Sequence, residues 1–407
     1  MKIYFDHSAT TPMDKKVLES MLPYFVNKFG NPSSLHDFGQ QAIAGVDKSR
    51  QVIADFLNCD SNELVFTSGA TESDNLAIFG TYKAAREKKD KLHIITSEIE
   101  HSAVLEPIKE LEKSGVKVTY LPTKKNGIVD ISKLKNSIQD NTFLVSIMYV
   151  NSEVGSIQPI REIGKIIKKV NEDRLKSWQK QGAKLGQQKP LATIFHTDAT
   201  QAVNFLNCDT KYLHVDLMSI SGHKIYGPKG VGALFVDTKV LIKGVQLGGH
   251  HENNLRSGTL NVPSLVGLGQ AIALVEEGKE TNNKQIKIIR DKLVKEILKN
   301  IPDTFLNTDI DNATPAHAHF TFGGVEGEAI LISLDLAGIA VSTGSACASG
   351  DLKPSHVLVA MGITPELSHN SIRFTLGKNN TIKDVDAVAK ILPNIIKKLR
   401  KIAPSDL

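Results

Sequence analysis

The chain has few cysteines, and their spacing excludes several kinds of site. Only three of the 407 residues are cysteine, Cys59, Cys208 and Cys347, and they lie far apart with no Cys-x-x-Cys pair. This pattern argues against a disulfide framework and a zinc site, and it is typical of proteins from a reducing compartment. We therefore expect a cytoplasmic protein that holds no metal ion.

The chain also lacks long apolar runs and a strong excess of one charge. Its longest apolar stretches, such as 143–150, are far shorter than the ~18 residues that a membrane-spanning helix requires. The N-terminus reaches the charged Asp6 without a preceding apolar region, so it does not resemble a signal peptide. The net charge is only +5 and is spread out, so we expect neither nucleic acid nor a membrane as a direct partner.

The composition is typical of a large globular protein. Hydrophobic residues make up 41% of the chain and charged residues 23%, which excludes disordered, collagen-like and coiled-coil proteins. The length predicts two to three domains and is sufficient to bury a sizeable core.

Short β-rich runs alternate with charged helical segments between residues 63 and 236. Several of these runs are continuously apolar, which favours strands covered on both faces. The alternation predicts an α/β fold whose large domain contains a doubly wound, mostly parallel, seven-stranded sheet. The seven runs are 63–68, 92–97, 116–121, 143–150, 192–198, 217–221 and 232–236.

The pattern changes after Asn261. A long helical stretch over 264–300 precedes fewer strands separated by helices, which predicts a smaller α+β domain. We expect the large domain to span 13–260 and the small domain to combine 1–12 with 261–407.

Two segments stand apart from this pattern. The polar, Lys- and Gln-rich segment 171–190 predicts either an inserted surface loop or a helix with an extended tail. The run 391–404 mixes Ile and Leu with Lys and Arg at helical spacing. This spacing favours a packed terminal helix with a basic outer face, although a helix on a membrane surface would show the same pattern.

The strongest local signal for a catalytic group is the segment 221–230, SGHKIYGPKG. It follows a predicted strand, and ligands of open α/β sheets bind beyond the carboxyl ends of the strands. Lys224 stands there among Ser221, His223 and three glycines that allow a ligand to approach the backbone closely. A lysine amine in a partly dry, cationic pocket loses its proton more readily and can form a Schiff base.

Polar residues follow three further predicted strands, and each allows two interpretations. Ala70 and Thr71 lie where a Gly turn opens a helix, which is either an anion site or a capping box with Thr71 as N-cap and Asp74 three residues later. His101 is either a packing residue or a ring that stacks on a flat cofactor or shuttles protons. Asp198 is either a helix cap or the partner of a protonated heterocyclic nitrogen.

Cys347 lies in a segment of small residues, 341–350. A structural cysteine is normally buried among large apolar neighbours, whereas one among Gly and Ser residues is typical of an exposed, reactive thiol. Cys59 and Cys208 have no such setting, so we expect both to be structural.

Together these segments resemble the cysteine desulfurases of the NifS/IscS type, pyridoxal 5'-phosphate enzymes of the class-V aminotransferase group. The resemblance covers nearly the whole chain in order and implies a fold-type I transferase. The motifs that carry it are YFDHSATTP (4–12), FGNPSSLH (29–36), FTSGATESDNLAI (66–78), SEIEHSAVL (97–105), DATQA (198–202), MSISGHKIYGPKGVGAL (218–234), RSGTLNVP (256–263), STGSACAS (342–349) and SIRFTLG (371–377).

The resemblance implies a role for each candidate residue. Lys224 would hold the cofactor covalently, and Asp198 would pair with its ring nitrogen. Arg373 would bind the substrate carboxylate through a two-pronged hydrogen bond. Family members are dimers with shared active sites, so one phosphate contact, from Thr259, would come from the partner subunit. The remaining cofactor contacts would be Gln201 to the ring hydroxyl, His101 on the ring face, and Ala70, Thr71, Ser221, His223 and Thr259 at the phosphate.

The implied reaction converts L-cysteine into L-alanine. Lys224 would remove the Cα proton, and the Cys347 thiolate would attack the substrate sulfur and keep it as a persulfide. The sulfur would pass to acceptor proteins such as an iron–sulfur scaffold, with transient cluster ligation by Cys347, for iron–sulfur cluster assembly or tRNA thiolation.

Three alternatives are compatible with parts of this pattern. A selenocysteine lyase would use the same site, and an aminotransferase would share the fold and cofactor but would need no nucleophile such as Cys347. A silent homologue is disfavoured because the candidate residues are all present. One departure from the family is Ser152, which stands where many relatives have an asparagine that contacts the ring hydroxyl and substrate.

Overall fold

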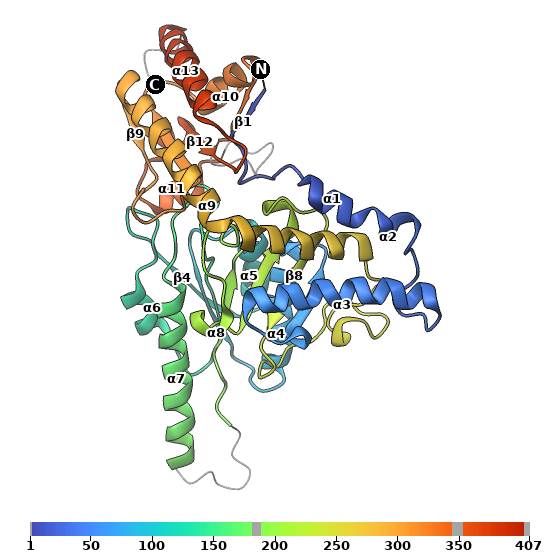
Figure 1. Ribbon diagram of the computed structural model, residues 1–407. Helices are drawn as coiled ribbons and strands as arrows, with labels where there is room; N and C mark the ends of the chain where they lie inside the picture. Colours follow the sequence, from blue (N-terminus) through green and yellow to red (C-terminus); the bar gives the residue numbers. More distant parts are fainter. Residues whose placement is uncertain (1, 181–188, 344–352, 403–407) are drawn as a thin grey trace.

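A seven-stranded sheet forms the centre of the fold (Figure 1). The computed structural model describes residues 2–180, 189–343 and 353–402. β8 runs antiparallel to both of its neighbours, and the other four pairings are parallel. The strand order across the sheet is β2 (Leu64–Thr67), β8 (Gly232–Val236), β7 (Leu217–Ser221), β6 (Ile194–Asp198), β5 (Thr142–Ser146), β3 (His93–Ser97) and β4 (Lys117–Leu121).

The seven predicted strands are thus confirmed, because both faces of the sheet are covered. Neighbouring residues of a strand point to opposite faces, and both kinds are apolar here. On β7, Met218 packs into the core that contains α3 (Asp37–Leu57) and the first half of α9 (Val262–Asn300). Leu217 packs into the core on the opposite face, with α4 (Ala70–Arg86). The run 143–150 was expected to be one strand, but β5 ends at Ser146 and the chain then turns into the site.

Helices cover the two faces of the sheet unequally. Helices α1, α3, α6, α7 and the start of α9 contribute to the core on one face, and α4 and α5 contribute to the core on the other. The helices up to the end of the sheet are α1 (Lys15–Met21), α2 (Pro23–Val26), α3 (Asp37–Leu57), α4 (Ala70–Arg86), α5 (Ser102–Lys113), α6 (Ile131–Ser137), α7 (Ile160–Lys180) and α8 (Thr210–Leu213), with 3-10 turns η1 (Ser61–Glu63), η2 (Gly222–Lys224) and η3 (Glu252–Asn254).

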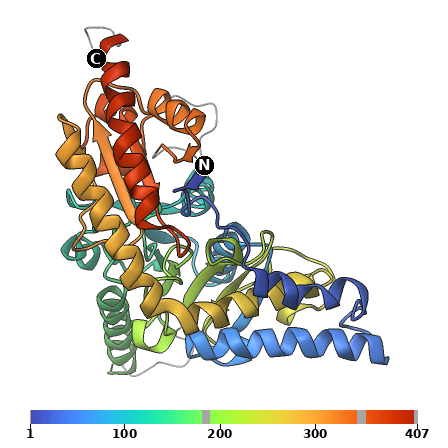
Figure 2. The ribbon, with the colours of Figure 1, turned by 45° about the horizontal axis from the view of Figure 1, so that its top comes forward.

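A second hydrophobic core lies at the far end of α9 (Val262–Asn300), beside α13 (Figure 2). Val262–Val275 pack into the core of the large sheet, and Ile286–Ile297 pack into the second core, so one helix joins both. The division into 13–260 and 1–12 with 261–407 stays a prediction. The remaining elements are β1 (Ile3–Tyr4), β9 (Thr304–Leu306), β10 (His317–Phe322), α10 (Gly327–Leu336), β11 (Ile339–Ala340), α11 (His356–Ala360), α12 (Pro365–His369), β12 (Ser371–Thr375) and α13 (Ile382–Ile402).

Two local expectations are settled by the structure. The segment 171–180 is helical, because α7 continues to Lys180, and residues 181–188 lie outside the described part of the chain. The C-terminal run packs through Leu392 and Ile396 of α13 (Ile382–Ile402), as expected for a terminal helix. Among the residues that the structure describes, no helix is long and apolar enough to span a bilayer.

Candidate active site

A cavity of about 580 Å³ opens at the carboxyl ends of the parallel strands. It lies where the strand–helix connections meet, as expected for an open α/β sheet. Thr259 does not line this cavity, and it is exposed between η3 and α9. Cys347 lies outside the described residues. The predicted residues brought together along the wall are Ala70, Thr71, His101, Asp198, Gln201, Ser221, His223, Lys224 and Arg373.

Lys224 is held against the N-terminal segment of the chain. It ends the short turn η2 directly after β7, and its Nζ donates to the carbonyl oxygens of Ser8 and Ala9, each at 2.6 Å. Gln201 Nε2 donates to the same Ser8 carbonyl at 2.9 Å. The segment around Ser8 therefore contacts Lys224 in the wall of the cavity. The order of the motifs along the chain does not predict this contact.

One end of the cavity suits an anion. The 17-residue helix α4 begins here after Gly69, whose φ of 150° disfavours any other residue. The first backbone N–H groups of a helix have no partner within the helix and attract negative charge. The N-cap is Gly69, so the capping-box alternative for Thr71 is wrong: Thr71 is the second residue of the helix and lines the cavity.

His223 adds a neutral donor or acceptor at this end. Burial, together with the smaller effect of the charges of Lys224 and Lys229, lowers its pKa from 6.5 to about 4. Its Nδ1 lies 3.2 Å from the hydroxyl of Thr10. The imidazole is therefore uncharged at neutral pH, and the positive charge near the anion end comes from the lysines and the helix.

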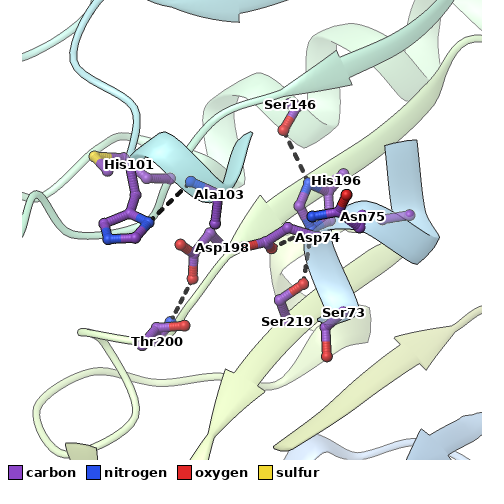
Figure 3. Close-up of polar contacts among 12 residues, drawn as sticks. Ser73, Asp74, Asn75, His101, Ala103, Ser146, His196, Asp198, Thr200 and Ser219 are labelled. Carbon is purple, nitrogen blue, oxygen red and sulfur yellow. Dashed lines mark hydrogen bonds and ion pairs between the residues drawn. The ribbon is translucent and has the colours of Figure 1, made fainter. Parts of the chain in front are cut away.

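Asp198 and His101 also line the cavity, and each makes a hydrogen bond to a backbone N–H (Figure 3). Asp198 is the last residue of β6, is largely buried, and accepts a hydrogen bond from the Thr200 N–H at 2.9 Å. His101 is the N-cap of α5, and its Nδ1 accepts from the Ala103 N–H at 3.1 Å. This bond leaves Nε2 to carry the proton of a neutral ring and fixes the orientation of the imidazole.

Arg373 reaches the cavity from β12 in the second core. It is only 5% exposed, its Nη1 donates to the Ser152 carbonyl at 3.0 Å, and its Nη2 donates to Asp6 Oδ1 at 2.8 Å. Its Nε makes no hydrogen bond to any residue that the structure describes. A guanidinium held this rigidly can present its remaining N–H to a planar carboxylate.

Ser152 lines the cavity, whereas its neighbour Asn151 has a structural role. The Asn151 side chain donates to the Ile99 carbonyl and accepts from the backbone N–H groups of Glu153 and Val154. The asparagine therefore builds the turn that places Ser152 in the wall. Ser152 carries a shorter side chain than the asparagine that the family resemblance leads us to expect there.

Sequence reasoning missed several buried ionisable groups near the cavity. Asp74 lines it, and Glu100, His196 and Glu153 are buried close by. Burial raises the pKa of Glu100 to about 8 and that of Glu153 to about 7. One signal was available: His196 and Asp198 are two residues apart on one strand, so they share a face.

Comparison with known proteins agrees with this arrangement. Proteins named cysteine desulfurase IscS from Clostridium botulinum (strain Hall) and Dictyoglomus turgidum are 43% and 44% identical over 405 residues, which cover 99% of this chain and 96% of each relative. A solved NifS-like protein superposes with a TM-score of 0.88 at 35% identity and covers 98% of this chain and 100% of its own. The solved structure of SspA in complex with cysteine has a TM-score of 0.78 at 34% identity and covers 94% and 100%.

The family pattern described as aminotransferase class-V matches residues 3–173 and 182–388. The match thus includes the strands, the cavity and the second core. The resemblance predicted from the sequence motifs and the predicted fold are both confirmed. The chain belongs to the class-V aminotransferase family.

Proposed function

We propose that the protein is a cysteine desulfurase that converts L-cysteine into L-alanine and passes the sulfur to an acceptor. The observation that supports this most is the meeting of Lys224, Asp198 and Arg373 in one cavity. An amine, a buried carboxylate and a guanidinium there suit a covalently held cofactor and an amino-acid substrate. Relatives that carry this name are more than 40% identical over nearly the whole chain.

The cavity fits pyridoxal 5'-phosphate as the cofactor. The N-terminus of α4, with Thr71, Ser221 and His223 also in the cavity wall, suits the phosphate, and the largely buried Asp198 suits a protonated ring nitrogen. The bound cofactor supplies an electron sink for the substrate carbon. The 2.6 Å contacts with Ser8 and Ala9 direct the Lys224 amine into the cavity, where it holds the cofactor and then takes the Cα proton.

The sulfur step requires a nucleophile beside the substrate. In the proposed reaction a Cys347 thiolate attacks the substrate sulfur, an S–S bond forms, and the Cβ–S bond breaks. The electron pair of the broken bond stays with the carbon, which takes up a proton and leaves as L-alanine. The enzyme keeps the sulfur as a Cys347 persulfide, so no external oxidant or reductant is required.

We also propose a homodimer whose two active sites are shared. Seven large apolar side chains between residues 18 and 38 are exposed, and a second copy of the chain would cover them. Thr259 is exposed, which leaves it free to reach the neighbouring site. The seven residues are Leu18, Leu22, Phe25, Val26, Phe29, Leu35 and Phe38. An iron–sulfur scaffold or a tRNA-thiolation carrier as sulfur acceptor, and a cytoplasmic location, stay predictions of the sequence.

The decisive experiment is to weigh the cysteine-containing peptides after brief exposure of the protein to L-cysteine without reductant. We expect one added sulfur atom on Cys347, reversed by a thiol, together with L-alanine. Cys59 and Cys208 are internal controls, because burial raises the pKa of each thiol to about 12 and keeps it unreactive. Alanine without added sulfur would contradict the sulfur step, and a faster reaction with selenocysteine would favour a selenocysteine lyase.

A further inference from the structure

A second carboxyl group lies near Asp198 and has no assigned role. Asp74, in the second turn of α4, lines the cavity and is completely buried. Neither carboxyl oxygen has a hydrogen bond of ordinary geometry to any described residue. Its nearest charged or ionisable contact is His196 of β6, whose Nε2 lies 3.5 Å from Asp74 Oδ1. A buried carboxylate without donors is strongly disfavoured.

His196 contacts Asp74 but does not supply a positive charge that would stabilise an ionised Asp74 (Figure 3). Its Nδ1 lies 2.9 Å from the Ser146 hydroxyl and its Nε2 lies 3.0 Å from the Ser219 hydroxyl, so hydroxyls satisfy both ring nitrogens. Histidine and carboxyl are both fully buried. An ion pair in this setting would need further hydrogen bonds to offset the loss of water, and Asp74 lacks them. The uncharged pair is therefore the stable form.

The surrounding charges act in the same direction. Burial raises the pKa of Asp74 well above 3.8, and the nearby carboxyl groups of Asp198 and Glu100 raise it further, while the Ser219 hydroxyl opposes the rise. Burial lowers the pKa of His196 to about 4. Where two carboxyl groups repel each other, the one with a hydrogen-bond donor of good geometry holds a negative charge more readily. Asp198 has that donor, the Thr200 N–H.

We propose that Asp74 is a positioning residue. With His196 beside it, its carboxyl group stays uncharged and leaves the negative charge on Asp198. Asp74 ionises only when the charge of Asp198 is removed. The inference rests on the proposed function, because it concerns the cofactor that Asp198 is proposed to hold. An uncharged Asp74 keeps the cavity wall polar and does not compete with Asp198 for the ring nitrogen of the cofactor. If Asp198 loses its charge, the main electrostatic opposition to ionisation of Asp74 disappears.

A double-mutant cycle on the apoprotein tests this coupling. The dissociation constant of pyridoxal 5'-phosphate is measured for the wild type, Asp74→Asn, Asp198→Asn and the double variant. We expect Asp74→Asn to weaken binding by less than about threefold in the wild type and by about tenfold or more when Asp198 is already Asn. Equal effects in both backgrounds would overturn the proposal.

The control and a second readout separate this role from a structural one. Asp216→Asn removes a half-buried carboxyl, which accepts from the Phe195 N–H and does not line the cavity, and should change binding equally in both backgrounds. The infrared difference between wild type and Asp74→Asn should show the carbonyl stretch of a protonated carboxyl, and its absence would overturn the proposal.

Asp74→Ser is also uncharged, so the same cycle and spectra can use it if Asp74→Asn does not fold. Failure of the wild type to bind pyridoxal 5'-phosphate would overturn the proposed function and this inference with it. Binding of pyridoxal 5'-phosphate without coupling between Asp74 and Asp198 would overturn this inference and leave the proposed function intact.

Discussion

Arg373 and Asp6 form an ion pair across 367 positions of the chain, with Nη2 and Oδ1 2.8 Å apart. Both side chains are largely buried, and the pair joins β12 to the segment that follows β1. The same N-terminal segment supplies the carbonyl groups that hold Lys224. The N-terminus therefore fixes both the proposed substrate-binding residue and the proposed cofactor-binding residue.

The first prediction concerns this ion pair. In Asp6→Asn the Arg373 guanidinium loses its charged partner, so we expect KM for L-cysteine to rise several-fold with a smaller change in kcat. We also expect the unfolding free energy to fall by about 1–3 kcal/mol. Asp14→Asn, which breaks the similarly buried pair with Lys378, is the matched control and should cost stability without raising KM. An unchanged KM in Asp6→Asn would contradict the positioning role of Asp6.

The second prediction concerns the lysine. Lys224→Ala removes the only amine of η2, so the protein should lose the visible absorption of bound pyridoxal 5'-phosphate and produce no alanine above background. Absorption spectra and a discontinuous alanine assay check both. Lys229→Ala, which changes another lysine of the same wall, should keep its colour and a measurable turnover. Sustained alanine production by Lys224→Ala would show that a different amine carries the chemistry.

The third prediction concerns Glu153, whose side chain is buried and accepts from the Ser355 hydroxyl at 2.6 Å. Burial raises its pKa from 4.5 to about 7, although Ser355 and the charges of Arg373 and His101 oppose the rise. The folded protein therefore binds more protons here than the unfolded chain between those values, so this stabilising contribution is present below pH 4.5 and is lost as the pH rises through 7.

Glu153→Gln should remove that dependence. Relative to the variant, the wild type should lose about 2–3 kcal/mol of unfolding free energy between about pH 5 and pH 8, measured by urea titration at each pH. Glu98→Gln, at an exposed position near the same connection, should show the wild-type dependence. Parallel curves for wild type and Glu153→Gln would mean that this carboxyl does not titrate in the window.

The fourth prediction concerns the proposed dimer. Val26 and Leu35 are 72% and 93% exposed, so a charge at either position costs the single chain little stability but disrupts an apolar interface. Val26→Asp with Leu35→Asp should convert the dimer to a monomer in size-exclusion chromatography with light scattering. Leu336→Asp, on the 84% exposed side chain at the end of α10, should leave the dimer intact. A dimer that persists in the double variant would place the interface elsewhere.

Much of the fold and part of the site could be predicted from residues close together in the sequence. The seven strands follow from apolar runs, and Lys224, Asp198 and His101 follow from polar residues directly after strands. The sequence left open whether Thr71 is an N-cap or faces an anion site, because the backbone conformation that makes Gly69 the N-cap is not specified by the sequence pattern. The end of β5 was misjudged because the apolar residues after Ser146 are buried in the site wall and not in a strand.

The sequence by itself determined which chemical groups this protein has and which strand ends carry them, because strand period, turn residues and motif order are local properties. Only the tertiary structure decided that Asp6 would hold Arg373, that Ser8 would contact Lys224, and that Asp74 would lie buried beside His196 and near Asp198. Burial and distance set the charge of such groups. Both depend on segments that are hundreds of residues apart in the chain and meet only when the two cores pack along α9.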